Sequence, residues 1–426
     1  MDFLHIAGIN RSGGSLLARL FDGHKDILSY PMEVGFHFDY TSYGFLDKIT
    51  GNPTCIPKFD KNINPIEYFQ AEKETFDYKW GSESASKFGV RKNYLEKAYY
   101  EKTLQTSFDH EQYVKKLKEY CSKSNSNQEF FEAKHKAYFE CWNNNTYFNN
   151  PKYVVTHASS GLFLSNFDRY FEDFKNSFII IPIRDCIGYV ASEKIRIARR
   201  FFGSRRFSKP LPPNFLVKHF NTYDLNSILR TWLIAISRIK LLQEKYASNN
   251  RLIVYRFEKL TESPSDVMKF FSKRLNFDYR ETLTTPTLCG KDWLGNSHQG
   301  KNKGIKSRPN EYYKNVLRKD EIDYIYSKTS NLNNILQNSK SFELDFLNID
   351  DKYFFDIEKQ RVASMKKNTW SLYCALGYSG FRKLKLSNSN YITVIAYFFS
   401  IFVRICHIPR LLKQKFFPGL GKQNYT

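Results

Sequence analysis

The stretch Ile6-Ala-Gly-Ile-Asn-Arg-Ser-Gly-Gly-Ser15 joins an apolar segment to a run of leucines at helical spacing. Residues 3–9 predict a short buried strand, and the apolar residues between 16 and 21 predict the helix that follows. The free N–H groups and the positive dipole end of such a helix N-terminus favour an anion. The stretch therefore predicts a phosphate-binding loop, with a structural Gly-Ser turn as the alternative.

The loop departs from the nucleotide-triphosphate motif at one position. Gly8, Gly13 and Ser15 fit the spacing of that motif, but Gly14 stands where the motif requires lysine. Arg11 is the one cation between residues 6 and 15. Because the lysine is missing, ordinary ATP chemistry is not favoured, and a magnesium-dependent nucleotide kinase is kept as an alternative function.

A second predicted strand ends in another arginine. Residues 177–183 form an apolar run typical of a buried parallel strand, and Arg184 and Asp185 follow it directly. Ligands of open α/β sheets bind outside the carboxyl ends of the strands, where Arg184 emerges. Ser192 stands a little over two helical turns further on, so we expect it near the same region. The alternative is an exposed Arg184–Asp185 pair with a solvent-facing serine.

Together these segments resemble the two cofactor-binding signatures of sulfotransferases that use 3′-phosphoadenosine 5′-phosphosulfate (PAPS). The loop from Arg11 to Ser15 is similar to the family's Arg/Lys-Ser-Gly-x-Ser/Thr loop, which holds the 5′-phosphosulfate. Arg184, Asp185 and Ser192 are similar to the signature that binds the 3′-phosphate. The resemblance therefore implies two anion sites for one nucleotide.

Two later blocks extend the resemblance over about the first 310 residues. Residues 251–264 resemble the family's strand-Glu-x-Leu segment, and residues 290–304 look like its late loop that closes over the nucleotide. Gly14 replaces the family's commoner Thr or Ser, and Cys186 replaces its frequent Pro. Neither departure removes a charged contact.

The resemblance implies an α/β fold with a P-loop-like central parallel sheet flanked by helices. We expect a sulfotransferase domain over residues 1–345, with a helical insertion at about 40–150 that shapes the acceptor site. Residues 346–426 are expected to form a C-terminal helical extension. Within this frame, residues 110–120 predict a helical patch and residues 225–246 a long amphipathic helix.

The implied reaction moves a sulfuryl group from PAPS to a hydroxyl, less favourably an amine, of a carbohydrate or glycolipid acceptor. Trp293 is a candidate for stacking on adenine, with a buried anchor of its loop as the alternative. Lys301 is a candidate contact of the cofactor phosphates, with a solvated basic surface as the alternative. The donor-binding residues predicted in this way are Arg11, Ser12, Gly13, Gly14, Ser15, Arg184, Ser192, Trp293 and Lys301.

Two residues are candidates for the general base. Glu33 follows the first predicted helix, where carbohydrate sulfotransferases that resemble this stretch carry a catalytic glutamate. His157 ends a predicted strand and resembles the Thr-His step of the cytosolic sulfotransferases. Histidine titrates near neutrality, whereas glutamate needs a raised pKa or an oriented substrate. The alternatives are a solvated carboxylate and a hydrogen-bonded strand-end histidine. Arg11 is the third catalytic candidate, because its charge would stabilise the leaving phosphate.

The composition favours anionic partners. The chain of 426 residues has 65 basic and 43 acidic side chains, a formal net charge of +22. Such a field attracts a phosphorylated nucleotide, a polyanionic glycan, nucleic acid or an acidic membrane. The basic residues are spread along the chain, so no nucleic-acid partner is predicted. No metal is predicted either, because the loop itself can neutralise the charge of the donor.

Cysteine usage and the two ends of the chain suggest a location. The seven cysteines are isolated and odd in number, which predicts free thiols in a reducing compartment. The chain enters the predicted loop strand directly, without a secretory signal or anchor, so we expect a cytoplasmic protein. Residues 391–417, apolar and then basic, predict either peripheral contact with an anionic membrane or a helix docked on the main domain. A non-enzymatic membrane-docking protein is therefore the second alternative function.

Overall fold

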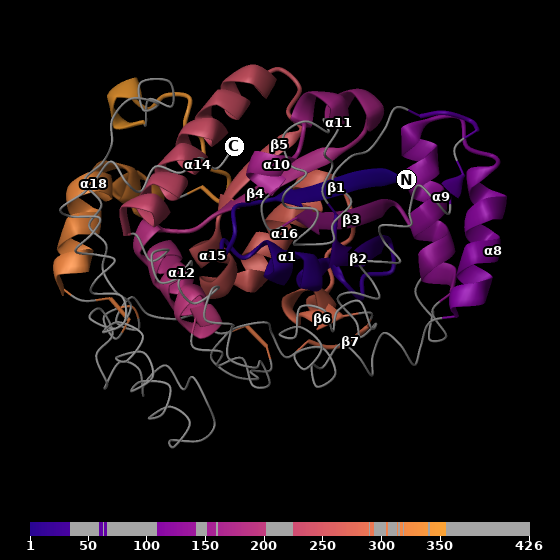
Figure 1. Ribbon diagram of the computed structural model, residues 1–426, viewed down its shortest axis with the longest axis horizontal. Helices are drawn as coiled ribbons and strands as arrows, with labels where there is room; N and C mark the ends of the chain where they lie inside the picture. Colours follow the sequence, from indigo (N-terminus) through magenta and orange to yellow (C-terminus); the bar gives the residue numbers. More distant parts are fainter. Residues whose placement is uncertain are drawn as a thin grey trace, which may run out of the picture.

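A five-stranded parallel sheet forms the centre of the molecule (Figure 1). The computed structural model describes residues 1–34, 59–62, 64–65, 109–141, 151–158, 161–201, 225–288, 290–293, 304–305, 313, 316–317, 319–339 and 341–354. In spatial order the strands are β2 (Ile27–Glu33), β3 (Tyr153–Ala158), β1 (Asp2–Ala7), β4 (Phe178–Ile183) and β5 (Leu252–Arg256). Each neighbouring pair is parallel, which confirms the predicted α/β fold.

The order of the strands reverses at β1. After β1 the chain forms β2 and β3 on one side of it, and then β4 and β5 on the other. Ligands of open α/β sheets bind at the carboxyl ends of the strands beside such a reversal. Ala7 ends β1 and Ile183 ends β4, so the predicted loop and Arg184 both begin at this point.

Helices cover both faces of the sheet. The sheet residues Leu4 and Ile6 pack into one apolar cluster, and Phe3 and Ala7 pack into another on the opposite face. The first cluster includes α1 (Gly14–Phe21) and α16 (Pro264–Leu275), and the second includes α11 (Phe167–Asp173), α12 (Cys186–Phe201) and α14 (Leu225–Tyr246). Strands buried on both faces are apolar throughout, which explains why residues 177–183 were recognisable as a strand.

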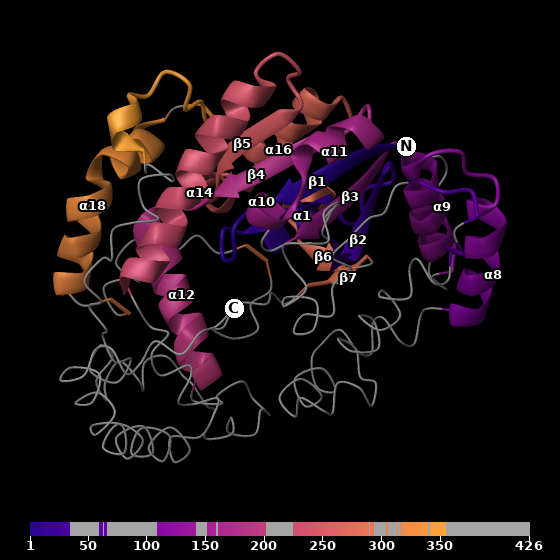
Figure 2. The same ribbon diagram turned by 45° about the horizontal axis from the view of Figure 1, so that its top comes forward.

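Within the 40–150 insertion, residues 109–141 form a pair of helices, of which the sequence predicted the first, at residues 110–120, but not the second. They are α8 (His110–Cys121) and α9 (Asn127–Glu140). Each helix begins with a side-chain cap, since Asp109 accepts the N–H of Gln112 and Ser126 accepts that of Glu129. The Tyr30 ring of β2 lies 5.0 Å from the Tyr138 ring of α9, so the pair covers the β2 edge (Figures 1 and 2).

The opposite end of the sheet is closed by α18 (Lys319–Asn338), which lies beside α12 in both views (Figures 1 and 2). The remaining elements are α10 (Gly161–Leu164), α15 (Phe257–Glu262), the hairpin β6 (Thr287–Leu288) and β7 (Lys291–Asp292), and the short 3₁₀ helices η2 (Glu281–Thr284) and η3 (Asp351–Tyr353). Of the predicted extension 346–426, only residues 346–354 are described, so the domain boundaries stay predictions. None of the helices in the described ranges is long and apolar enough to cross a bilayer.

Candidate functional site

The loop between β1 and α1 is held by close backbone packing. Gly13 caps α1 with a positive φ of 93°, and a Cβ placed on it would lie 2.0 Å from the Phe257 ring. Arg11 also adopts a positive φ, 71°. The buried Ser12 hydroxyl donates to the carbonyl of Ile9 at 2.5 Å, so this predicted ligand contact is used within the loop itself. The loop geometry therefore requires glycine at position 13.

The start of α1 has the features of an anion site. No side chain caps the helix and its first turn carries no acidic residue. The N–H groups of Leu16 and Leu17 turn back to the carbonyl of Gly13, and Gly14 and Ser15 are partly exposed. The first N–H groups of a helix lack partners within the helix, so this end can bind negative charge.

The two predicted anion sites meet in space. Arg11 Nε donates to Ser192 Oγ at 3.0 Å, and Arg184 Nη1 donates to the Arg11 carbonyl at 3.2 Å. Ser192 is only 9% exposed, so the alternative of a solvent-facing serine is wrong. Residues far apart in the sequence thus form one continuous site above β1 and β4.

The guanidinium of Arg184 lies between aromatic rings. Its Cζ is 5.1 Å from the centre of the Phe257 ring and 5.7 Å from that of Tyr313, and Nη2 donates to the Tyr313 hydroxyl at 2.8 Å. Its Nε is buried and has no hydrogen-bond partner in the described structure. A buried donor without a partner is costly, so this position fits an anionic ligand.

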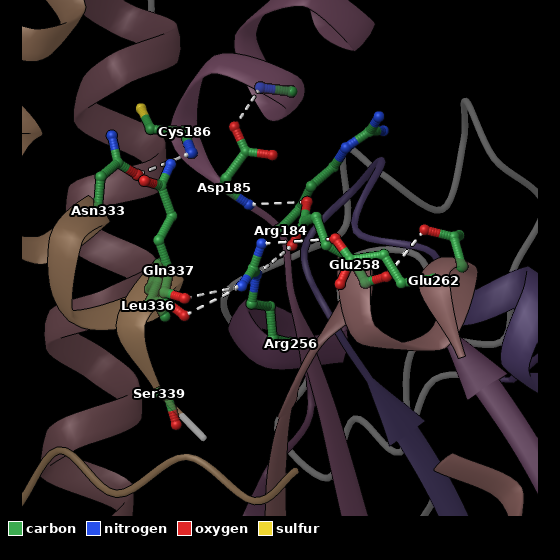
Figure 3. Close-up of polar contacts among 12 residues, drawn as sticks. Arg184, Asp185, Cys186, Arg256, Glu258, Glu262, Asn333, Leu336, Gln337 and Ser339 are labelled. Carbon is green, nitrogen blue, oxygen red and sulfur yellow. Dashed lines mark hydrogen bonds and ion pairs between the residues drawn. The ribbon is translucent and has the colours of Figure 1, made fainter. Parts of the chain in front are cut away.

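Two carboxyl groups support the Arg184 end of the site (Figure 3). Asp185 Oδ1 accepts the Gly188 N–H at 2.7 Å and caps α12, so the alternative of an exposed pair is wrong. Glu258 of α15 accepts the Asp185 N–H at 3.2 Å and the Arg256 Nε at 3.3 Å. Burial, and after it the nearby Asp185 carboxyl, raise the pKa of Glu258 above its ordinary value.

The two candidate bases lie on neighbouring strands. Glu33 is the last residue of β2 and its backbone pairs with that of His157 on β3. The next N–H, that of Val34, donates to the His157 carbonyl at 2.8 Å. The His157 side chain is 4% exposed, and the Glu33 side chain lies outside the described structure. The sheet register therefore brings both candidates to one place, and the choice between them stays open.

An arginine that sequence reasoning missed stabilises the end of β2. The β2–β3 register shifts between Ser29 and Glu33, where Pro31 supplies no N–H to the ladder. Arg19 of α1 donates through Nη2 to the Pro31 carbonyl at 2.6 Å and is 3% exposed. The Ser29 hydroxyl donates to the Ala18 carbonyl at 2.6 Å. The proline inside an apolar strand was the sequence signal for this bulge.

The late loop is described in part. The Trp293 side chain is buried, with the residue 5% exposed, and its backbone N–H donates to the Pro286 carbonyl at 3.1 Å. The hairpin before it is hydrogen-bonded to Asp22, which follows the C-terminal end of α1. Asp22 Oδ2 accepts from Thr287 Oγ1 at 2.7 Å and from the Gly290 N–H at 2.9 Å. Stacking of Trp293 on adenine stays a prediction, and Lys301 lies outside the described residues.

The arrangement separates two chemical functions along one edge of the sheet. The strand ends of β1 and β4 carry the cations and the helix N-terminus, while those of β2 and β3 carry the carboxylate and imidazole residues. Such an edge can bind an anionic donor beside a residue that removes a proton from an acceptor. No group of His, Cys, Asp and Glu side chains able to hold a metal occurs in the described part of the chain.

Comparison with known proteins gives weak structural likenesses. No protein-family model and no curated protein matches this sequence. The chain is similar to the sulfotransferase domain from the Synechococcus PCC 7002 olefin synthase, with 13% identity and a TM-score of 0.39 over 77% of this chain and 93% of that one. It is similar to the sulfotransferase domain from the curacin biosynthetic pathway, with 15% identity and a TM-score of 0.39 over 77% and 97%.

A third solved structure, sulfotransferase STF1 from Mycobacterium tuberculosis H37Rv, matches at 13% identity with a TM-score of 0.29 over 66% of this chain and 69% of that one. Likenesses this weak do not show a shared function, so the function proposed below depends on the residues of this chain alone.

Proposed function

We propose that this protein is a PAPS-dependent sulfotransferase. The observation that carries the proposal is the contact between the two nucleotide signatures, Arg11 Nε to Ser192 Oγ at 3.0 Å and Arg184 Nη1 to the Arg11 carbonyl at 3.2 Å. A nucleotide with phosphate groups at both its 5′ and 3′ ends needs two such anion sites within its own span. A kinase would need the lysine that Gly14 replaces.

The donor would lie above β1 and β4. The N-terminus of α1, with Arg11 and Ser15, would bind the 5′-phosphosulfate, and Arg184 with Ser192 would bind the 3′-phosphate. Arg11 contacts Ser192 directly, so the same hydrogen bond that joins the signatures also orients the cation nearest to the leaving group. Trp293 and Lys301 are proposed to complete the donor site.

The acceptor would lie above β2 and β3, beside Glu33 and His157. One of these residues would take the proton of the acceptor hydroxyl, whose oxygen forms a bond to sulfur while the bond from sulfur to the phosphate oxygen breaks. Arg11 and the α1 N-terminus would stabilise the charge that develops on the leaving phosphate. The reaction then depends on alignment and electrostatics. We propose a carbohydrate or glycolipid hydroxyl as the acceptor, with an amine as the less favoured group.

The first experiment measures donor binding. We expect wild-type protein to bind 3′-phosphoadenosine 5′-phosphate in calorimetry, and Arg184→Ala to weaken this affinity by about tenfold to a hundredfold, since a charge-assisted phosphate contact is lost. Glu33→Ala should keep the affinity within about threefold. Unchanged binding in Arg184→Ala would refute the assignment of the 3′-phosphate site.

A second experiment measures turnover. Purified protein incubated with radiolabelled PAPS and a glycan and lipid extract should label an acceptor, and Glu33→Ala or His157→Ala, whichever removes the base, should slow that transfer by about a hundredfold or more. Magnesium-dependent ATP turnover without sulfate transfer would favour the kinase instead. The cytoplasmic location stays a prediction. The membrane contact of residues 391–417 also stays a prediction, because those residues lie outside the described structure.

A further inference from the structure

Three polar atoms meet above Gly188, in the first turn of α12. They lie close to the position that a Cβ on Gly188 would take: Asp185 Oδ2 at 2.7 Å, Arg184 Nε at 2.9 Å and the Tyr313 hydroxyl oxygen at 3.1 Å. A second carboxyl group is near, since Glu258 accepts the Asp185 N–H at 3.2 Å (Figure 3). The Arg184 guanidinium therefore has carboxyl groups within its reach.

Arg184 nevertheless donates to neutral oxygens. Its Nη1 donates to the Arg11 carbonyl at 3.2 Å and its Nη2 to the Tyr313 hydroxyl at 2.8 Å, while its Nε has no hydrogen-bond partner in the described structure. In the same part of the chain it forms no ion pair with Asp185 or Glu258. A guanidinium paired with a carboxylate would attract phosphate weakly, because the two charges cancel. The observed contacts leave the charge of Arg184 for a ligand.

Two anchored aromatic rings hold the guanidinium in this orientation. Its Cζ lies 5.1 Å from the centre of the Phe257 ring and 5.7 Å from that of the Tyr313 ring. The Phe257 ring fills the space beside Gly13, where a Cβ would lie 2.0 Å from it. Tyr313 is 6% exposed, and its carbonyl accepts the Leu317 N–H at 2.8 Å. Rings fixed in this way pre-organise an arginine that stacks on them.

On the basis of the function proposed above, we propose that Tyr313 is a positioning residue of the donor site. Its hydroxyl holds the Arg184 guanidinium away from the neighbouring carboxyl groups, and this makes the site selective for nucleotides that carry a 3′-phosphate. Without the hydroxyl, the guanidinium can turn toward Asp185, and its charge is then partly cancelled.

A tyrosine that only fills the core would behave differently. The Tyr313 ring belongs to the larger apolar cluster of the molecule, so a loss of packing would disturb the whole donor site. A loss of the Arg184 orientation would affect the 3′-phosphate alone. Two nucleotides that differ only in this group, 3′-phosphoadenosine 5′-phosphate and adenosine 5′-phosphate, separate the two roles.

The test is calorimetry of both nucleotides with the full-length protein, with competition titrations for the weaker ligand. Wild-type protein should bind the 3′-phosphorylated nucleotide about tenfold or more tightly than the other. Tyr313→Phe keeps the ring, and we expect it to weaken binding of the 3′-phosphorylated nucleotide by about fivefold to twentyfold. Its affinity for adenosine 5′-phosphate should stay within about twofold of wild type, because that nucleotide does not contact Arg184.

A double-mutant cycle shows whether the hydroxyl acts through the arginine. In an Arg184→Ala background, Tyr313→Phe should weaken binding of either nucleotide by no more than about twofold, since the group that it orients is gone. Tyr255→Phe is the matched control. The Tyr255 side chain is buried in β5 and its hydroxyl has no hydrogen-bond partner in the described structure, so its removal should leave both affinities unchanged.

Equal losses for the two nucleotides in Tyr313→Phe would overturn the inference and leave the proposed function standing. The same holds if Tyr313→Phe binds both nucleotides as wild type does, or if its loss is equally large in the Arg184→Ala background. A wild-type protein that binds neither nucleotide, or both with equal affinity, would overturn the proposed function and the inference together.

Discussion

At the scale of single residues, two glycines of the loop have different roles. A Cβ on Gly13 would meet the Phe257 ring at 2.0 Å and the backbone there has a φ of 93°. A Cβ on Gly14 would meet the Ile6 side chain at 3.2 Å, a tight contact that a shift of a few tenths of an ångström in that side chain would relieve. The two neighbouring positions therefore form a matched pair for substitution.

We expect Gly13→Ala to lower the free energy of unfolding by about 2–4 kcal/mol, because alanine is strained at positive φ and its methyl group displaces a buried ring. Gly14→Ala should change it by less than about 1 kcal/mol. Urea unfolding of both variants measures the difference. Equal losses would show that the ring contact does not constrain this loop.

Residue identity in the site was readable from the sequence only where a local pattern existed. The Gly-Ser loop and the Arg184 strand end are local patterns, and the structure brings them together as expected. Tyr313 contacts Arg184, and Arg19 contacts the Pro31 carbonyl, only because the folded chain brings them together. No sequence spacing predicts either contact. The sequence therefore predicts which segments carry charge but not which distant side chains orient them.

At the scale of elements, a buried ion pair joins α12 to α18. Lys194 Nζ lies 2.6 Å from Glu321 Oε2, and both side chains are fully buried. Breaking such a pair leaves an uncompensated charge away from water, whereas replacing both partners by apolar residues removes the charge altogether. The helix that carries Ser192 is thus connected to the end of the molecule formed by α18.

We expect Lys194→Met and Glu321→Leu each to lower the free energy of unfolding by about 3–5 kcal/mol. The double variant should recover most of that loss, because it leaves no unpaired charge. Urea unfolding of the wild type and the three variants gives the free energies needed for a double-mutant cycle. Additive losses in the double variant would argue against a coupled pair.

Elements were predictable where a periodic apolar pattern ran unbroken. The predicted helix 225–246 and the strand 177–183 match α14 and β4 closely, whereas β1 ends at Ala7 and releases Gly8 and Ile9 to the loop. The order of the strands had no local signal, because it depends on pairings between residues up to about 170 positions apart, such as Leu4 with Phe178.

At the scale of the whole molecule, charge and topology favour the same ligand. The strand reversal at β1 places both arginines at one edge, and the chain as a whole carries a formal net charge of +22. A positive field accelerates the approach of anions, and dissolved salt screens it. Long-range attraction and direct contact are therefore separable by ionic strength.

We expect the association rate constant of 3′-phosphoadenosine 5′-phosphate to fall by about tenfold between 0.03 and 0.5 M NaCl, measured by stopped-flow fluorescence. Arg184→Ala should keep nearly the same salt dependence, since one charge of 65 contributes little to the long-range field while its loss speeds dissociation. A rate constant that does not change with salt would mean that the positive field does not extend over the donor site, and that binding there depends on the short-range contacts of Arg11, Arg184 and the α1 N-terminus alone.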